Sequence, residues 1–288
     1  MADTGMRGKI CLVTGGTAGI GAATARGLAQ REATVVIIGR NEQLGVARVR
    51  QLKEETGNSA VELMLADLSS QQEIRRLARE FTERYSRLDV LVNNAGALFM
   101  SRRQSVDGIE MTFALNHLSY FLLTNLLLDM LEACAPARIV NVASDAHEGA
   151  TIDVAALQGT VGLFGMKAYG QSKLANVLFT YELARRLAGT GVTVNTLHPG
   201  VVGSGFGMNN GWLAALGMRL IHRFSLSPEE GAETSIYLAT SPEVAGVTGK
   251  YFVKKSPVPS SKATYDVDVA RRLWELSEQL TGLTSPAM

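Results

Sequence analysis

Apolar, β-rich runs alternate with helix-period segments along almost the whole chain. Seven runs are predicted as strands: Lys9–Val13, Thr34–Ile38, Ala60–Leu65, Asp89–Val92, Arg138–Val142, Val192–Leu197 and Gly249–Val253. Seven segments are predicted as helices: Ile20–Gln30, Glu42–Glu55, Gln71–Tyr85, Gly108–Leu131, Tyr169–Leu187, Pro228–Thr240 and Val267–Leu280. Strands that are apolar throughout are typical of a parallel sheet covered by helices on both faces. The pattern therefore predicts one doubly wound α/β domain with a mostly parallel, seven-stranded sheet.

Two segments break this alternation and are predicted as substrate loops. Residues 145–166 carry four glycines and little periodicity, and residues 203–224 begin with spaced glycines before an amphipathic stretch. Long connections at the carboxyl ends of strands are where such folds place their ligand loops. No linker divides the chain, so residues 1–288 are predicted as a single domain, with a tail at 1–8 and a C-terminal segment at 254–288.

Charge and cysteine usage argue against several classes of function. With 28 basic and 27 acidic residues the net charge is +1, so we expect no nucleic-acid partner and no attraction to an anionic membrane. Two cysteines, Cys11 and Cys134, do not make a disulfide framework, and Cys11 lies in an apolar run that predicts a buried free thiol. The four histidines lack metal-ligand spacing, so no metal site is predicted.

No segment is predicted to cross a membrane. The N-terminal tail lacks the apolar core of a signal peptide. The most apolar helical stretch, Leu118–Leu131, is interrupted by Asn125 and Asp129 and is too short for a membrane span. We therefore expect a cytoplasmic protein without a transmembrane segment.

A glycine-rich turn joins the first predicted strand to its helix. In TGGTAGIG at 14–21, Gly15 permits a sharp turn, Gly19 lets the backbone approach a pyrophosphate, and Gly21 permits close packing of helix on strand. The strand–turn–helix context indicates a dinucleotide site rather than an ordinary connecting turn. The predicted contacts of this turn are Gly15, Thr17, Ala18, Gly19, Ile20 and Gly21.

The end of the second strand distinguishes between the nicotinamide cofactors. A carboxylate there binds the ribose hydroxyls of NAD, but this chain has Gly39-Arg40-Asn41 and no acid before Glu42. Arg40 can hold a 2′-phosphate by its charge and its forked donors, which favours NADP(H). The alternative is a solvated arginine and a site that also accepts NAD(H).

Two further strand ends offer cofactor contacts. Asp67 can accept from an adenine amino group while Leu68 packs on the ring, or Asp67 can instead cap the next helix. After the fourth strand, small residues leave room beside a cofactor and asparagine amides can bridge backbone groups, although the same residues also suit a stabilising turn. These candidates are Asn93, Asn94, Ala95 and Gly96.

Tyr169 and Lys173 are spaced i and i+4 on a predicted helix, so the phenol and the ammonium share one face. A free tyrosine titrates near pH ~10, and a neighbouring positive charge lowers its pKa. A phenol tuned in this way can exchange a proton with an alcohol or carbonyl oxygen. The spacing alone is weak, but together with the glycine-rich turn it indicates a catalytic pair.

These residues together resemble the short-chain dehydrogenase/reductase family, whose Rossmann-type fold agrees with the predicted architecture. The resemblance covers almost the whole chain in the family's order: TGGTAGIG at 14–21, Asp67, NNAG at 93–96, Asn116, Ser144, YGQSK at 169–173 and HPG at 198–200. The chain looks most like the retinol-dehydrogenase-like branch, on Gly39-Arg40-Asn41, residues 197–202 and residues 270–275. Two departures from the branch are expected to matter: no N-terminal anchor is expected in this chain, and a Gly203-Ser204 pair stands where a bulkier residue and threonine are usual.

The resemblance implies hydride transfer between a nicotinamide cofactor and a carbonyl or alcohol carbon. It implies that Tyr169 donates or accepts the proton, that Ser144 hydrogen-bonds the substrate oxygen, and that Lys173 also binds the nicotinamide ribose. It further implies that Asn116 holds a water near the lysine. Cofactor contacts after the sixth strand are expected at Pro199, Gly200 and Val202.

The substrate is expected to be a lipophilic aldehyde, ketone or alcohol. Apolar side chains near the predicted loops suit such a molecule, or are ordinary core residues: Leu98, Phe99, Met100, Leu163, Phe164, Met166, Phe206, Met208 and Trp212. The alternatives are a non-catalytic NADP(H)-binding regulator and an enzyme of related fold that performs ring reduction, epimerisation or dehydration. The helical stretches 108–131 and 169–187 can pack in a homodimer or homotetramer, or be covered within one subunit.

Overall fold

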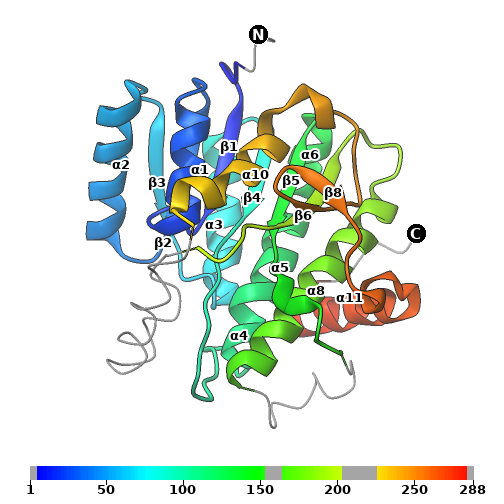
Figure 1. Cartoon of the computed structure of the whole chain (residues 1–288). Coiled ribbons are helices and arrows are strands. Elements are labelled where there is room, and N and C mark those ends of the chain that lie inside the picture. The colour runs from blue at the N-terminus through cyan, green and yellow to red at the C-terminus, as the bar shows by residue number, and fades with distance from the viewer. Residues whose placement is uncertain (1–4, 153–163, 203–225, 284–288) are drawn as a thin grey trace.

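Within residues 5–152, 164–202 and 226–283, which the computed structural model describes, eight strands form one sheet (Figure 1). Their order is β3 (Val61–Leu65), β2 (Thr34–Gly39), β1 (Ile10–Thr14), β4 (Val90–Asn93), β5 (Arg138–Val142), β6 (Thr193–His198), β7 (Tyr251–Val253) and β8 (Ser256–Val258). Neighbouring strands from β3 to β7 are parallel, and β8 runs antiparallel to β7. The predicted doubly wound α/β fold is confirmed.

The prediction of seven strands was wrong, because it missed the edge strand β8. This strand pairs Val253 with Ser256 across a two-residue turn in which Lys254 and Lys255 have φ values of 48° and 65°. Positive φ at both central positions is the geometry of a tight hairpin turn, which usually carries Asn-Gly or Asp-Gly. Two lysines in succession gave no such signal, and the exposed Ser-Pro-Val segment does not resemble a buried strand.

Helices cover both faces of the sheet (Figure 1). On one face, α1 (Gly19–Ala29), α2 (Glu42–Thr56) and α10 (Pro228–Thr240) share a hydrophobic core with β1, β2 and β5. On the other face, α3 (Gln71–Arg84), α5 (Ser119–Leu126) and α8 (Gly165–Arg186) form a second core, which α11 (Val267–Thr281) joins. Successive residues of β1 serve opposite cores: Leu12 packs in the second, and Cys11 and Val13 in the first.

The stretch predicted as one helix from 108 to 131 is divided into four pieces. It begins only at α4 (Met111–Phe113), where the Glu110 carboxylate caps the main-chain nitrogens of Thr112 and Phe113. A π-helical turn, η1 (Ala114–Leu118), then leads into α5, and a break at Leu127 precedes α6 (Leu128–Ala133). Single π-turns inside helices are frequent at functional sites, and this one contains Asn116.

The strand order reverses between β2 and β4 on either side of β1, so the connections after β1 and β4 diverge. Between such connections doubly wound sheets bind their ligands. The Thr14 hydroxyl joins the two connections, because its Oγ1 accepts from the main-chain nitrogens of Asn94 at 2.8 Å and Ala95 at 3.0 Å. The glycine-rich turn and the segment from Asn93 to Gly96 therefore form one continuous edge.

Candidate active site

The glycine-rich turn leaves the start of α1 open. Gly15 has a φ of 65°, and a Cβ on Gly21 would lie 2.3 Å from the main-chain oxygen of Gly15. Ala18 at the N-cap provides no side-chain hydrogen bond, and no acidic residue lies in the first turn of α1. The first main-chain N–H groups of this helix thus lie at a tight, glycine-rich turn without an acidic side chain, which fits a pyrophosphate.

Arg40 lies beside this turn at the end of β2. A Cβ on Gly39 would meet the Cγ2 of Thr17 at 2.4 Å, so the turn packs directly on the strand end that precedes Arg40. Arg48 of α2 fixes the contact by donating from Nε to the main-chain oxygen of Thr17 over 3.0 Å. Arg40 itself is exposed, and no hydrogen bond or ion pair engages it in the described ranges. The position leaves its guanidinium open to an anionic ligand.

Several predicted cofactor contacts have structural roles in addition. Asn41 is the N-cap of α2, since its Oδ1 accepts from the main-chain nitrogen of Leu44 over 3.0 Å. Asp67 Oδ1 accepts from the main-chain nitrogen and the hydroxyl of Ser69, while Ser70, not Asp67, caps α3. The alternative of Asp67 as that helix cap is therefore wrong.

Asn93, the last residue of β4, and Asn94, which follows it, face different ways. Asn94 lies at the edge and donates from Nδ2 to the main-chain oxygen of Thr14 over 2.8 Å. Asn93 is fully buried and donates from Nδ2 to Thr124 and to Asn141, each over 2.9 Å. Its side chain braces β4 against β5 and α5 and is withdrawn from the ligand edge. Ala95 is buried and Gly96 is exposed.

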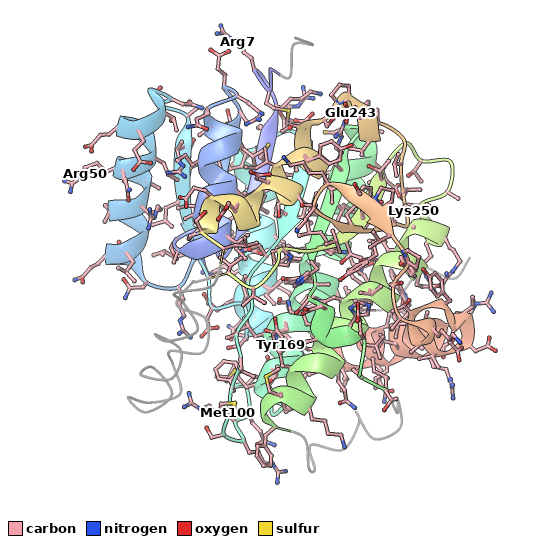
Figure 2. All side chains as sticks on the ribbon, in the orientation of Figure 1. Arg7, Arg50, Met100, Tyr169, Glu243 and Lys250 are labelled. Atoms are coloured by element: carbon pink, nitrogen blue, oxygen red, sulfur yellow. The ribbon has the colours of Figure 1, made fainter. Side chains whose placement is uncertain are left out.

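Tyr169 and Lys173 lie together on α8 and both are buried. Figure 2 shows Tyr169 and Met100 toward one end of the molecule, with Arg7 and Glu243 at the other. The Nζ of Lys173 is 5.6 Å from the centre of the Tyr169 ring and donates to the main-chain oxygen of Val142 over 2.9 Å. Burial lowers the pKa of Lys173 to about 7.

The prediction that Lys173 lowers the pKa of Tyr169 was wrong, because the protein groups around the phenol raise this pKa. Burial raises the pKa of Tyr169 to about 12, a hydrogen bond with Ser144 acts in the opposite direction, and the charge of Asp145 raises the pKa further. Lys173 does not counter this, because its ammonium is turned to Val142 and is itself destabilised by burial.

Ser144 follows β5 and begins the 3-10 turn η2 (Asp145–His147). Its Oγ donates to Asp145 Oδ1 over 3.0 Å and accepts from the main-chain nitrogen of Ala146 over 3.2 Å. His147 is fully buried and donates from Nδ1 to the main-chain oxygen of Ser144 over 2.7 Å. His198, at the end of β6, accepts at Nδ1 from the main-chain nitrogen of Asp145 over 3.2 Å.

The sequence did not single out Asp145, and of His147 and His198 it indicated only that they lack metal-ligand spacing. A signal was present: Asp145 directly follows Ser144, and His198 ends the strand that pairs with β5. Because the carboxyl ends of neighbouring parallel strands meet at one edge of a sheet, these groups had to converge.

Asn116 joins the helices of the site to the edge of the sheet. In η1 its Oδ1 accepts from the main-chain nitrogen of Ala97 over 2.9 Å, and its Nδ2 donates to the Ala97 oxygen and to Ser172 Oγ. Gly96 lies next to it, since a Cβ there would be 3.2 Å from Asn116 Oδ1 and 3.6 Å from Lys173 Nζ. Asn116 is thus adjacent to the lysine, as the water-holding hypothesis requires.

The segment after β6 closes the same edge. Pro199 and Gly200 are half-buried, and Gly200 has a φ of 86°. Val202 forms an isolated bridge with Leu226 and packs near Gly231 of α10, where an added Cβ would meet its Cγ2 at 2.5 Å. A ligand extending from α1 toward Tyr169 would pass this segment.

Apolar side chains lie beyond the catalytic pair. Met100, Phe164 and Met166 are exposed by 49%, 57% and 57%, whereas Leu98 and Phe99 are buried. The main-chain nitrogen of Gly165 donates to the Phe99 oxygen over 3.0 Å, which joins this loop to the start of α8. Predicted pocket residues outside the described ranges are Leu163, Phe206, Met208 and Trp212.

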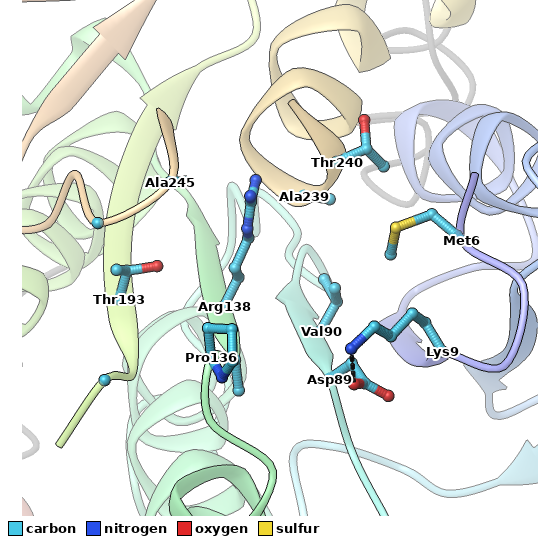
Figure 3. Close-up of a pocket in the computed structure, with 13 residues that line it drawn as sticks. Met6, Lys9, Asp89, Val90, Pro136, Arg138, Thr193, Ala239, Thr240 and Ala245 are labelled. Atoms are coloured by element: carbon cyan, nitrogen blue, oxygen red, sulfur yellow. Dashed lines mark hydrogen bonds and ion pairs between the residues drawn. The ribbon is translucent and has the colours of Figure 1, made fainter. Parts of the chain in front are cut away.

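A separate cavity of about 420 Å³ lies at the amino ends of the central strands (Figure 3), and Tyr169 is not among the residues that line it. Asp89 in its wall accepts from Lys9 Nζ over 2.9 Å, and Arg138 donates from Nη1 to the main-chain oxygens of Leu238 and Ser241. These contacts tie the strands to the end of α10. The cavity does not contain the candidate catalytic residues.

The described residues contain no helix long and apolar enough to cross a membrane. Among the same residues, no group of three histidine, cysteine or acidic side chains could hold a metal ion. Cys11 is buried and both cysteines are free thiols, as the apolar run around Cys11 predicted.

Comparisons with known proteins agree with this geometry. Residues 9–211 match the family model described as short chain dehydrogenase. The chain is 42% identical to retinol dehydrogenase 13 of Homo sapiens, over 98% of this chain and 87% of the relative. It is 41% identical to polyprenol dehydrogenase of Homo sapiens, over 96% and 86%.

Two solved structures are similar over most of their length. An uncharacterized protein of Mycobacterium paratuberculosis has a TM-score of 0.78 and 33% identity, with 98% of this chain and 97% of that chain covered. The NADP active-site complex of Pseudomonas aeruginosa RhlG has a TM-score of 0.70 and 32% identity, with 88% and 96% covered.

Proposed function

The chain belongs to the short-chain dehydrogenase family, in its retinol-dehydrogenase-like branch, and on that premise we propose that it is an NADP(H)-dependent oxidoreductase of lipophilic carbonyl compounds and alcohols. The observation that carries the proposal is the convergence of Ser144, Tyr169 and Lys173 next to the glycine-rich edge. Tyr169 hydrogen-bonds Ser144, and Lys173 lies on the same face of α8.

The residues that hold the substrate oxygen also move its proton. In reduction, Tyr169 gives its phenolic proton to the oxygen of the carbonyl group, and in oxidation its phenolate accepts the alcohol proton. Ser144 donates to the same oxygen and stabilises the charge that develops there. Lys173 and Asn116 are assigned to the ribose and to a proton path, as in the family.

The donors along the edge fit a dinucleotide. The open N-terminus of α1 suits the pyrophosphate, because a side chain on Gly21 would fill the turn. Asp67 and Leu68 are assigned to the adenine, and Gly96, Pro199 and Gly200 to the nicotinamide half. When bound, the cofactor supplies or accepts the hydride.

Preference for NADP(H) rests on Arg40. The side chain is exposed beside Thr17 and Gly39, and no carboxylate precedes Glu42 after β2. A forked guanidinium binds a phosphate through charge-assisted hydrogen bonds, whereas NAD selection uses an acid at this position. The solved RhlG structure, which is similar to this chain, is an NADP complex.

A lipophilic substrate is supported by the side chains beyond Tyr169. Met100, Phe164 and Met166 expose apolar surface next to one another, with Met100 Sδ 3.8 Å from the position of a Cβ on Gly165. Apolar walls with few polar groups suit a hydrophobic ligand. The names of the relatives, retinol dehydrogenase and polyprenol dehydrogenase, also refer to apolar alcohols. We assign residues 145–166 and 203–224 as substrate loops of one domain; of these, residues 153–163 and 203–224 lie outside the described part of the chain.

The test is consumption of NADPH with a panel of aldehydes and ketones, with NADH run in parallel. We expect turnover of apolar carbonyl compounds with NADPH, and a loss of kcat of about 10²- to 10⁴-fold in Tyr169→Phe with NADPH binding retained. The matched control is Tyr237→Phe. Tyr237 lies on α10 and its hydroxyl donates to Glu243, so its removal should leave kcat unchanged. NADPH binding without consumption of any carbonyl would favour a regulator, and product analysis would reveal ring reduction, epimerisation or dehydration instead.

A further inference from the structure

The carboxylate of Asp145 lies directly against the serine of the proposed catalytic group. Ser144 donates from Oγ to Asp145 Oδ1 over 3.0 Å. A serine hydroxyl carries one proton, so a hydroxyl that donates to a carboxylate does not donate elsewhere at the same time. Hydrogen bonds to an ionised acceptor are also the stronger kind. Asp145 therefore competes with a developing oxyanion for the single proton of Ser144.

The contact between Ser144 and Asp145 affects the pKa of Tyr169. Burial raises its pKa to about 12, a hydrogen bond with Ser144 acts in the opposite direction, and the negative charge of Asp145 raises the pKa again. A phenolate is stabilised by a donor and destabilised by a nearby like charge. Asp145 thus opposes the phenolate in two ways, through its charge and through its competition with Tyr169 for the Ser144 proton.

The histidine beside Asp145 is in a neutral tautomer. His198 Nδ1 accepts from the main-chain nitrogen of Asp145 over 3.2 Å, and His198 Nε2 lies 3.6 Å from Asp145 Oδ2. Because Nδ1 is an acceptor, the ring proton is on Nε2 and faces the carboxylate. Burial lowers the pKa of His198, although the charge of Asp145 acts the other way. At neutral pH the imidazole is therefore uncharged and does not neutralise the carboxylate.

The other titratable groups around Asp145 come from three elements. The buried His147 and the exposed Glu148 lie on the same short turn. On β7, the pKa of Tyr251 is raised by burial and then by the charges of Asp145 and Glu148. On α8, Lys173 donates to a main-chain oxygen of β5. Within the described part of the chain, Asp145 has no lysine or arginine partner.

We propose that Asp145 is a positioning residue that keeps Tyr169 in its phenol form, by competing for the Ser144 proton and by placing a negative charge near the phenol. The proposal rests on the proposed function. A phenol is the form that donates a proton in carbonyl reduction, and a phenolate is the form that accepts one in alcohol oxidation. Asp145 does not alter the reaction equilibrium. It sets the pH range in which each direction is fast, so reduction is fully active at neutral pH and oxidation rises only in alkali.

The test compares pH profiles of kcat/KM for both directions in wild type, Asp145→Asn and Asp145→Ala. Asparagine keeps an oxygen acceptor for Ser144 without the charge, whereas alanine removes both. We expect the falling limb of reduction and the rising limb of oxidation to move together to lower pH, by about one pH unit in Asp145→Asn and further in Asp145→Ala. Because the Asp145 side chain is 54% exposed, both variants should fold.

The matched control is Asp268→Asn, which removes an exposed carboxylate on α11, outside the proposed substrate loops, that does not act on Tyr169. Its profile should match wild type. An equal shift in Asp268→Asn, or unchanged limbs in both Asp145 variants, overturns the role of Asp145.

A second readout does not depend on turnover. Ultraviolet difference titration follows tyrosinate formation, and Tyr169→Phe identifies the contribution of Tyr169. A lower titration pH in Asp145→Asn supports the role of Asp145 even if no substrate is turned over, in which case the proposed function alone fails. An unchanged titration of Tyr169 in both Asp145 variants overturns the role.

Discussion

The Nζ of Lys173 lies 2.9 Å from the main-chain oxygen of Val142 and 5.6 Å from the centre of the Tyr169 ring. The ammonium is therefore anchored to the end of β5 rather than to the phenol. Burial brings its pKa down to about 7. A lysine held in this way at the ligand edge suits contact with a ribose, but does not by itself produce a tyrosinate.

Replacing Lys173 by an apolar residue should stabilise the fold but reduce turnover. The pKa of Lys173 is about 7 in the fold against 10.5 for the free side chain, so the unfolded chain binds more protons between these values. Through this group the free energy of unfolding rises as the pH increases over that window. Lys173→Met should raise the free energy of unfolding by about 2 kcal/mol at pH ~7 and flatten its rise with pH, since a buried charge is removed.

Urea denaturation of wild type and Lys173→Met at several pH values between neutrality and pH ~9 measures this. Turnover should fall together with the gain in stability. A variant that is less stable than wild type across the whole range would contradict the account of the buried ammonium.

Arg40→Ala should change the cofactor preference. Loss of a charge-assisted contact to a phosphate should raise the KM for NADPH by about 10- to 100-fold and leave the KM for NADH nearly unchanged. Arg50→Ala is the matched control, because Arg50 is another exposed arginine, on the neighbouring helix α2. A wild-type preference for NADH, or equal effects of the two substitutions, would remove the role given to Arg40.

Gly21→Ala should disable cofactor binding. The added methyl group would lie 2.3 Å from the Gly15 oxygen and 2.4 Å from Asn94 Nδ2, so the turn must open. We expect a destabilisation of about 1–3 kcal/mol from overpacking and a loss of NADPH fluorescence enhancement. Gly149→Ala is the control, since nothing lies within 4 Å of its added Cβ. Normal cofactor binding by Gly21→Ala would contradict the proposed cradle.

His117 should make the fold sensitive to acid. Burial lowers its pKa to about 4, against 6.5 for the free side chain, although a hydrogen bond to Asn176 acts the other way. The unfolded chain therefore binds more protons between these values, and stability is lost as the pH falls from about 6.5 to about 4. The loss through this group is up to about 3 kcal/mol.

His117→Gln keeps amide groups for Asn176 and Ser277 and does not titrate in this range. Its thermal unfolding temperature should fall less steeply between pH ~6.5 and pH ~4.5 than that of wild type. Parallel curves for the two proteins would mean that other groups control the acid sensitivity.

Periodicity and residue spacing predicted most strands and the main site residues. Features that no local sequence pattern marks were missed. The central strands were predicted because runs such as Thr34–Ile38 are buried on both faces. The hairpin at Lys254 and Lys255 was missed because its positive φ values are imposed by packing rather than by glycine or asparagine. The π-turn that contains Asn116 was missed for a similar reason, since side-chain hydrogen bonds to Ala97 hold it.

The candidate site was also only partly predictable. The spacing of Tyr169 and Lys173 correctly placed them on one helical face, but the burial that raises the pKa of one and lowers that of the other depends on the surrounding elements. The contact of Asp145 with Ser144 depends on rotamers and on His198 from the next strand. Spacing along the chain indicates which side chains meet, whereas burial and proton positions depend on the assembled structure.

The single hydroxyl of Thr14 joins two connections that form the proposed cofactor site. Because it accepts from the main-chain nitrogens of Asn94 and Ala95, the connections after β1 and β4 are locked to each other before a ligand arrives. Association then loses little conformational entropy in assembling this edge. We therefore expect that the connections after β1 and β4 change little in conformation when a nucleotide binds.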